Sequence, residues 1–428
     1  MKRLAAIALS ALSLTAVLVA QRGTPAKPLD IYVVDTEGGK AALWVSPSGQ
    51  SLLIDSGNPG NRDLDRIMAA IKDAGLKQID FLVSTHYHGD HIGGLTELAK
   101  QIPIVHFIDH GPSVEEREQV QGFQAAYAEL YGKAKHTVVK PGDKIPIAGL
   151  DWRIVSSAGN VLKTPLPGGG KPNPACAGVA PKDASPTDDN GQSVGSVITF
   201  GQFRAIDLGD LLWNKENDLM CPNNPIGTVD AYFVTHHGLD QSGSPALVFG
   251  LQPRVAIMQN GTRKGAGTEA MKTMRSSPGL EDIWQLHWSY NAGLELNSAG
   301  VFIANIDDAA TIAGVLTAVP RGGGPGGAAR GGQGAPAGAP PAGAGASAPT
   351  GQPAGAPAAP SPAAAGAPQG GAPGTAGGGV PGAGGGRGGA AVAAHTPAYW
   401  IKMSVQPDGT FTVTNSRNGF SKTYAKRR

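Results

Sequence analysis

The fold is decided by one stretch, Thr85-His-Tyr-His-Gly-Asp-His91, which follows directly on the largely apolar run 79–84. That run has the length and composition of a strand. The stretch places three imidazoles and one carboxylate within six residues, and zinc accepts both kinds of ligand. In an extended turn His86 and His88 point to one side, while Asp90 and His91 can reach a second point. The spacing predicts two adjacent metal ions at a strand end; a polar loop of hydrogen-bonded histidines is the alternative.

Two later segments repeat this order of strand and then ligand. The run 203–208 leads into Gly209-Asp210, and the run 230–235 leads into His236-His237. A lone Gly-Asp pair is a weak signal and a His pair is a moderate one. Because both follow strands downstream of the first motif, Asp210 and His236 are predicted to join the same site.

The elements around these motifs alternate between strand pairs and helices. Apolar periodicity predicts helices at 62–74 and 114–131. Strands are predicted at 31–34, 41–45, 51–54, 79–84, 152–156, 194–200, 203–206, 231–235, 255–258 and 301–306, with a hairpin at 399–405 and 410–414. This order favours an αββα or α/β sandwich over a strictly alternating parallel sheet.

With these motifs the chain resembles the metallo-β-lactamase superfamily of binuclear metallohydrolases, over about residues 30–305 plus the terminal hairpin. The ligand motifs are joined by Leu53-Ile-Asp-Ser-Gly57, which is similar to that family's Asp-containing strand end. Within the superfamily the chain is most similar to the metallo-hydrolase domain of competence DNA-uptake proteins and phosphorylcholine esterases. That similarity rests on Asp35-Thr-Glu-Gly-Gly39, Asp90-His-Ile-Gly-Gly94 and Thr235-His-His-Gly238. The fold implied is α/β (α+β), an αββα sandwich with metals at the edge between its sheets.

The resemblance also implies a ligand set and a reaction. The metal ligands would be His86 and His88 for one ion, Asp90, His91 and His236 for the other, and Asp210 as the bridge. Two Zn²⁺ ions per chain are implied, with other divalent metals as alternatives, and hydrolysis by a metal-bound hydroxide that Asp90 helps to orient. His237 would lie beside a ligand or face the substrate, and which of the two adjacent histidines binds metal stays open.

The chain departs from most hydrolases of this superfamily at one ligand. Where a third His for the first metal is usual, this sequence reads Asp188-Asp-Asn-Gly-Gln-Ser-Val194, with Asn190 at the place of the His. The competence-type branch similarly lacks that His. His110, in Ile108-Asp-His-Gly111, is a candidate to fill the gap; a polar residue at the start of a helix is the alternative.

The first residues have the pattern of a secretory signal. Met1-Lys-Arg3 is positively charged, and an apolar and small-residue run follows from 4 to 20. We expect residues 1–20 to be removed and the protein to be exported, to the periplasm or the medium, with no stable membrane span; an uncleaved anchor is the alternative. In that oxidising setting Cys176 and Cys221 are predicted to form a disulfide, with two free thiols as the alternative.

Composition divides the remaining chain. The 428 residues include 63 Gly and 34 Pro, concentrated with Ala between 321 and 390, where too little apolar surface exists to offset the entropy of ordering. We therefore predict a metallo-β-lactamase-like domain at 27–318, a disordered insertion at 320–395 and a docked C-terminal hairpin at 396–426. The net charge is +2, but its positive excess lies in the leader, the insertion and the last residues. The body is thus acidic, which disfavours strong nucleic-acid binding.

The leading hypothesis is an exported binuclear zinc hydrolase acting on a small molecule, first a phosphoester or phosphodiester, by subfamily resemblance alone. One alternative is a lactone or other acyl-compound hydrolase of the same fold. Another is a cell-envelope binding protein that uses a hydrolase fold.

Overall fold

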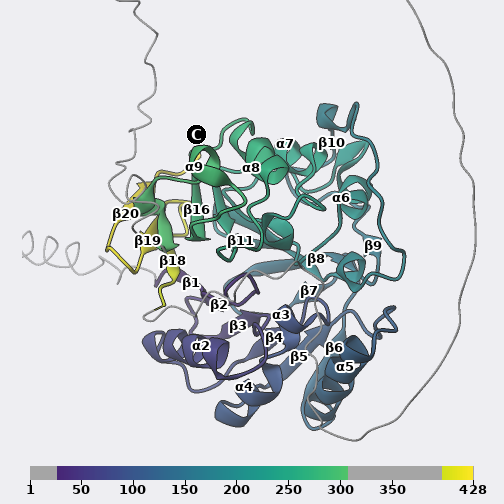
Figure 1. Cartoon of the computed structure of the whole chain (residues 1–428), viewed down its shortest axis with the longest axis vertical. Coiled ribbons are helices and arrows are strands. Elements are labelled where there is room, and N and C mark those ends of the chain that lie inside the picture. The colour runs from purple at the N-terminus through teal and green to yellow at the C-terminus, as the bar shows by residue number, and fades with distance from the viewer. Residues whose placement is uncertain (1–26, 307–397, 428) are drawn as a thin grey trace, which may run out of the picture. The chain divides into compact units, whose positions relative to one another are not determined.

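The computed structural model describes residues 27–306 and 398–427 (Figure 1). The predicted signal at 1–20 and the predicted insertion at 320–395 lie outside the described residues. Among the helices of the described ranges, none has the length and apolar character needed to cross a bilayer. The described residues all belong to one compact unit.

Two large sheets make up this unit. The first has the strand order β20 (Ser421–Tyr424), β19 (Phe411–Asn415), β18 (Ile401–Val405), β1 (Leu29–Val33), β2 (Ala42–Val45), β3 (Ser51–Ile54), β4 (Phe81–Val83), β5 (His106–Asp109), β6 (Lys135–Val138). The second has the order β17 (Ile303–Asn305), β16 (Asp282–His287), β15 (Val255–Met258), β14 (Ala231–Phe233), β12 (Phe203–Asp207), β11 (Gly195–Phe200), β8 (Asp151–Ser157), β7 (Lys144–Ile145), with β9 (Asn160–Val161) paired to β8. A small ladder joins β10 (Lys171–Pro172) to β13 (Asn223–Asn224).

The main core lies between the two sheets. Trp44 on β2 packs edge-on against Trp152 on β8, with ring centroids 5.3 Å apart, and lies 5.1 Å from Phe233 on β14. Alternate residues of each strand face this layer, as period-two strands require, and they belong to one cluster of buried apolar side chains. The sheets therefore stack face to face.

Helices cover the outer face of each sheet (Figure 1). On the first sheet these are α2 (Asn61–Asp73), α4 (Leu95–Gln101) and α5 (Glu118–Tyr131), which share an apolar cluster with the strands. On the second they are α6 (Trp213–Met220), α7 (Pro245–Leu251) and α8 (Thr268–Arg275). The shorter helical elements are α3 (Gly89–Ile92), α9 (Gly293–Leu296), η1 (Pro174–Cys176), η2 (Asp189–Gln192), η3 (Thr235–Gly238) and η4 (Gly300–Phe302). The predicted αββα sandwich is confirmed.

The last described residues continue the first sheet. β18 pairs antiparallel with β1, from Leu29 opposite Val405 to Val33 opposite Ile401. Phe411 on β19 reaches across to Phe203 of the second sheet, with ring centroids 5.2 Å apart. The segment forms a hairpin as expected and adds a third strand, β20, which the polar run Ser421–Tyr424 did not predict.

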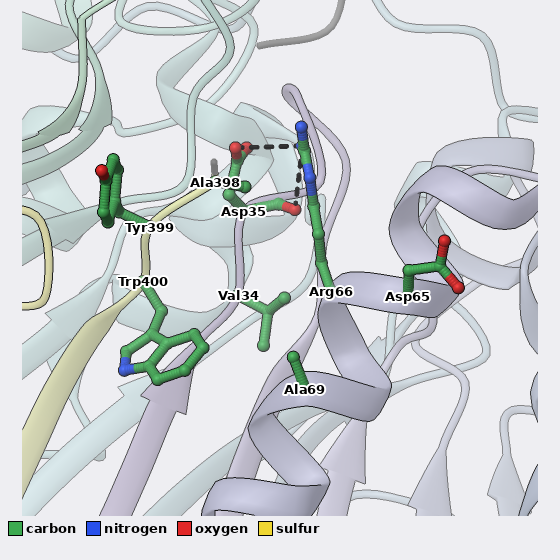
Figure 2. A pocket seen from close by; sticks show the side chains of 8 residues that line it. All are labelled: Val34, Asp35, Asp65, Arg66, Ala69, Ala398, Tyr399 and Trp400. Carbon is green, nitrogen blue, oxygen red and sulfur yellow. Dashed lines mark hydrogen bonds and ion pairs between the residues drawn. The ribbon is translucent and has the colours of Figure 1, made fainter. Parts of the chain in front are cut away.

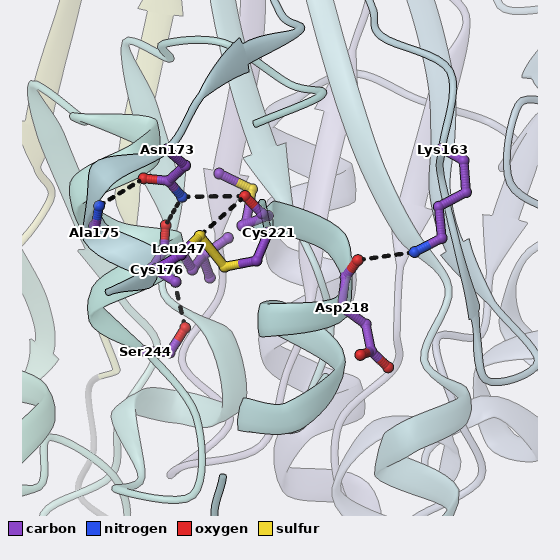
Figure 3. Close-up of a disulfide and its surroundings, with 10 residues drawn as sticks. Lys163, Asn173, Ala175, Cys176, Asp218, Cys221, Ser244 and Leu247 are labelled. Atoms are coloured by element: carbon purple, nitrogen blue, oxygen red, sulfur yellow. Dashed lines mark hydrogen bonds between the residues drawn. A yellow bond between two sulfur atoms is a disulfide. The ribbon is translucent and has the colours of Figure 1, made fainter. Parts of the chain in front are cut away.

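A disulfide joins Cys176 in η1 to Cys221 at the end of α6 (Figure 3). Beside it the Asn173 side chain donates to the carbonyls of Met220 and Ala246, at 3.2 and 2.9 Å. These contacts fasten one end of the long polar loop that runs on to η2, and this loop contributes residues to the site described next.

Candidate metal centre

The ends of several strands meet at one edge of the sandwich and bring the sequence motifs together. The chain leaves β4 at Val83, and the residues after it form the turn that leads into α3. Gly209, after β12, has φ +59° and lies so close to Thr85 that a Cβ would come within 2.8 Å of the Thr85 Cβ. The glycine is thus needed both for its backbone conformation and for this close approach. It places Asp210 beside the His-rich turn.

Four ligand atoms converge in the centre of this edge, from Asp90, His91, Asp210 and His237. The Nε2 of His91 lies 3.3 Å from Asp90 Oδ2, 3.1 Å from Asp210 Oδ2 and 3.2 Å from His237 Nε2. The Nε2 of His237 lies 3.2 Å from each of the same two carboxylate oxygens. Such a group of nitrogen and oxygen atoms matches the ligand chemistry of a divalent transition metal.

His236 and His237 occupy different positions although they are adjacent. Both have φ 55°, in the left-handed region that residues with a Cβ rarely adopt. The turn directs His237 into the four-atom cluster, whereas His236 Nε2 lies 3.5 Å from Asp210 Oδ2 and its Nδ1 lies 3.2 Å from Ser242 Oγ. His236 also lines a neighbouring pocket. The sequence alone points to His236 as the ligand and leaves the choice between the two histidines open; the geometry favours His237.

Buried partners orient the imidazoles from behind. Asp55, at the end of β3, holds His91 Nδ1 at 2.8 Å and accepts a hydrogen bond from Thr85 Oγ1, also at 2.8 Å. Thr85 Oγ1 in turn lies 3.1 Å from His86 Nδ1. On the other side, His237 Nδ1 lies 3.1 Å from the carbonyl of Gln259. Partners at Nδ1 leave Nε2 directed at the cluster, as is common for metal-binding histidines.

A second group of ligand atoms lies beside the first, on His88, Glu115 and Asp188. The Nε2 of His88 is 2.8 Å from Glu115 Oε2, and the His86 ring lies 4.6 Å from the His88 ring. Among the described residues, the buried His86 Nε2 has no hydrogen-bond partner. Glu115 was not singled out from the sequence, because it lies six residues beyond β5 rather than at the strand end.

The charges of this edge depend on one another. Burial alone would raise the pKa of Asp210, but the nearby charges of His237 and His91 outweigh burial and hold the pKa well below its usual range. Burial similarly opposes ionisation of His91, yet Asp210, Asp90 and Asp55 raise its pKa well above its usual value. Burial lowers the pKa of His86 well below its usual value. His86 therefore stays a neutral imidazole, the form that binds metals.

The two other residues considered for the first metal have different surroundings. Asn190 is buried in η2, and its Oδ1 has no partner within the part of the chain that the structure describes. His110 packs on Tyr87, with ring centroids 4.7 Å apart, and its Nε2 lies 3.5 Å from Asp189 Oδ2. Asp189 also accepts a hydrogen bond from the Tyr87 backbone at 2.7 Å. His110 thus supports the turn and does not belong to the ligand group around His88.

A polar pocket of about 240 Å³ opens beside the centre. Its lining includes Lys182, Asp188, Asn190, Trp213 and His236. The Lys182 ammonium lies over the Trp213 ring at 3.8 Å. Half of the lining residues, from Lys182 to Asn190, come from the polar, Pro-rich loop that the disulfide holds at one end. The pocket gives a substrate a place to lie next to the metal-binding edge.

A further cation stands at the cluster itself. Lys264, 39% exposed, forms an ion pair with Asp90 Oδ2. Its ammonium group can therefore meet solvent and ligand atoms at the same time.

The group Asp35, Glu37 and His287 also has ligand atoms close together. Here Arg66 already binds both carboxylates, at 3.0 Å from Asp35 and 3.1 Å from Glu37, and His287 Nε2 lies 2.7 Å from Asp35. Figure 2 shows Arg66 and Asp35 on the wall of a separate hollow of about 200 Å³, near Trp400. We interpret this group as an ion-pair network that joins α2 to the second sheet.

Comparisons with known proteins agree with the fold. A family model described as the metallo-beta-lactamase superfamily matches residues 35–176. A hydroxyacylglutathione hydrolase from Citrobacter koseri is 29% identical over 122 residues, which are 28% of this chain and 39% of that protein. ComE operon protein 3 of Bacillus subtilis is 28% identical over 189 residues, 44% of this chain and 20% of that protein. The chain thus matches less than half the length of these relatives.

Solved structures show a weaker likeness. A diphosphatase from the PhnP family has 15% identity and a TM-score of 0.34, over 59% of this chain and 94% of that one. CmlA, a diiron beta-hydroxylase from Streptomyces venezuelae, has 18% identity and a TM-score of 0.32, over 55% and 45% of the two chains. These values carry no argument about chemistry.

Proposed function

We propose that this chain, which matches the metallo-beta-lactamase superfamily model over residues 35–176, is an exported enzyme that uses two zinc ions to hydrolyse a phosphoester or phosphodiester. One observation carries the metal part of the proposal. Four ligand atoms at zinc's usual bond length of 2.0–2.2 Å would lie about 3.3–3.6 Å apart at the corners of a tetrahedron. The five separations given above among Asp90, His91, Asp210 and His237 are 3.1–3.3 Å.

The donor atoms that remain support a second ion. Asp210 Oδ1 is buried without a hydrogen-bond partner among the described residues, as is His86 Nε2. The His86 ring lies 4.1 Å from the His91 ring and 4.6 Å from the His88 ring, so His86 stands between the two groups of ligand atoms. When bound, such ions lower the pKa of water and polarise the scissile bond.

The chain's own side chains would then prepare the site. Asp55 fixes the ring of His91 through Nδ1, and Gln259 fixes His237 in the same way, so little reorganisation is needed on binding metal. Asp90, whose side chain is 20% exposed, would orient a nucleophilic water. Lys264 pairs with Asp90 at the cluster, and Lys182 pairs with Glu269 beside a pocket whose lining also holds Asp183 and Asp188. Both ammonium groups are partly exposed and can also bind an anionic phosphoester.

An acyl-compound hydrolase is the second candidate. It is supported by the likeness to hydroxyacylglutathione hydrolases at 28–29% identity over 122 residues. A thioester of glutathione also carries negative charge, so the two lysines do not exclude it. The choice between the two therefore depends on a direct assay.

The test uses the purified full-length chain, stripped with a chelator and reloaded with zinc. Hydrolysis of bis(p-nitrophenyl) phosphate is compared with hydrolysis of a hydroxyacylglutathione thioester. We expect turnover of the phosphodiester, its loss in Asp90→Asn, and no change in the control Asp65→Asn, an exposed aspartate on α2. Faster turnover of the thioester would support the acyl alternative. Metal binding with no turnover of either would support a binding protein.

Export is tested separately. The full chain is expressed in a Gram-negative host, and the N-terminus of the protein in the periplasmic fraction is sequenced. We expect a new N-terminus after Ala20. A chain that starts at Met1 and stays with the cytosolic fraction would contradict export.

A further inference from the structure

The ligand group around His88 differs in chemistry from the group around His91. Both groups have two imidazoles at hand, His86 and His88 in one and His91 and His237 in the other. The group around His88 adds the carboxylates of Glu115 and Asp188, and the buried Oδ1 of Asp210, unpaired among the described residues, is left over from the group around His91. It is therefore richer in oxygen and has one ligand more.

Glu115 is held in place by its own loop. Its backbone N–H donates to Ser113 Oγ at 3.1 Å, and its carbonyl accepts from Gln121 Nε2 at 2.6 Å. The carboxylate Oε2 accepts from the backbone N–H of Asp189 at 3.3 Å and lies 2.8 Å from His88 Nε2. Glu115 is buried, so its neighbours restrict the positions that the carboxylate can take. An oxygen atom is thus presented next to the imidazole.

Arg117 contacts the same Glu115 carboxylate and His88 imidazole that a metal ion would bind. It pairs with Glu115 Oε1, and its NH2 group lies 3.0 Å from His88 Nε2. It is 62% exposed and can move into solvent at little cost in packing. An exposed arginine is not a permanent partner for a buried carboxylate and imidazole.

Independent observations point to a ligand between these groups. The His86 side chain is fully buried, and its Nε2 has no partner among residues 27–306 and 398–427. The Oδ1 of Asn190, two residues beyond Asp188, is likewise buried and unpaired in the described ranges. Unpaired buried polar atoms are rare and call for an explanation such as a bound ion.

We propose that Glu115 and Asp188 complete the first metal site together with His86, His88 and Asp210, and that this site accepts Mn²⁺ while zinc occupies the group around His91. Five protein ligands with an oxygen majority suit a six-coordinate ion, and carboxylate-rich sets favour manganese. The four-atom group around His91 suits tetrahedral zinc. The inference rests on the proposed metal centre but not on the proposed substrate.

The experiment measures binding rather than activity. The metal-free full-length chain is loaded with one equivalent of Zn²⁺, and Mn²⁺ is then added while the electron paramagnetic resonance signal of free Mn²⁺ is recorded. We expect the wild type to take up one Mn²⁺ with the zinc retained. Glu115→Gln should weaken Mn²⁺ binding at least about tenfold, whereas Glu116→Gln, an exposed neighbour, should bind as the wild type does.

Each outcome bears on the inference. Equal Mn²⁺ affinity in Glu115→Gln and the wild type, or release of the zinc by Mn²⁺, would overturn it. Circular dichroism shows whether Glu115→Gln is folded; if it is not, Asp188→Asn takes its place, with the same expected loss of Mn²⁺ binding. Normal Mn²⁺ and Zn²⁺ uptake without any phosphodiester hydrolysis would refute the proposed substrate and leave this inference standing.

Discussion

Replacing His237 by Ala should weaken the tighter zinc site far more than replacing its neighbour His236. The two variants are well matched, because both residues have φ 55° and each substitution places Ala in the same strained region. They differ in what the imidazole reaches. His237 Nε2 lies 3.2 Å from both Asp90 and Asp210, while His236 Nε2 lies 3.5 Å from Asp210 alone.

The magnitude follows from the number of ligands. Four-ligand zinc sites have apparent binding free energies of about 10–16 kcal/mol. An equal share for each ligand is then about 3–4 kcal/mol, and every 1.4 kcal/mol is about a tenfold change in Kd. We therefore expect His237→Ala to raise the zinc Kd by about two to three orders of magnitude, and His236→Ala by less than about tenfold.

Competition with a chromogenic zinc chelator measures both constants at one pH and salt concentration. Thermal unfolding with and without zinc provides a check, since a ligand that binds only the native state stabilises it by RT ln(1 + L/Kd), where L is the free zinc concentration. His237→Ala should lose most of that shift. A larger loss of zinc affinity in His236→Ala than in His237→Ala would refute the assignment.

Three further results are expected. Burial raises the pKa of Glu216 to about 7, above its value in the unfolded chain. The free energy of unfolding therefore falls as pH rises between the two pKa values, by up to about 3 kcal/mol. Urea unfolding from pH 4 to 8 should show this slope, and Glu216→Gln should flatten it. Removing residues 398–427 takes away six buried apolar side chains, each contributing about 1.5–3 kcal/mol. Their summed contribution is as large as a typical net stability of about 5–15 kcal/mol. The shortened chain should therefore lack a cooperative melt, and an unchanged melting temperature would contradict the packing. The six are Ile401, Met403, Val405, Phe411, Val413 and Tyr424. The double substitution of Cys176 and Cys221 by Ser should lower stability by about 2–4 kcal/mol, while an unchanged denaturant midpoint would argue against a stabilising role.

Local patterns were enough to predict the sandwich and most of the centre. His86, His88, Asp90 and His91 lie within six residues of one turn, so their spacing carries the geometry. Asp210 follows a strand directly, and parallel pairing of β12 with β14 brings the two strand ends to the same edge. Where a ligand sits at a strand end, the sequence already contains its position.

Other parts depended on contacts distant in the sequence. The choice between His236 and His237 is made by two backbone torsions and by the carbonyl of Gln259, and no periodicity reports either. Glu115 meets His88 from a loop 27 residues away. Strand β20 has only one buried residue, Tyr424, so its pattern resembles a polar tail until β19 is there to pair with it.

The pairing of β1 with β18 also bears on how quickly the protein can reach its native state. Leu29 is among the first described residues, and its partner Val405 lies close to the C-terminus. β1 can pair with β18 only after the residues up to Val405 have been synthesised. Folding rates fall as contacting residues become more distant in sequence, and an uncovered strand edge invites wrong pairing in the meantime. We therefore expect closure of the β1–β18 ladder to be a late step in folding.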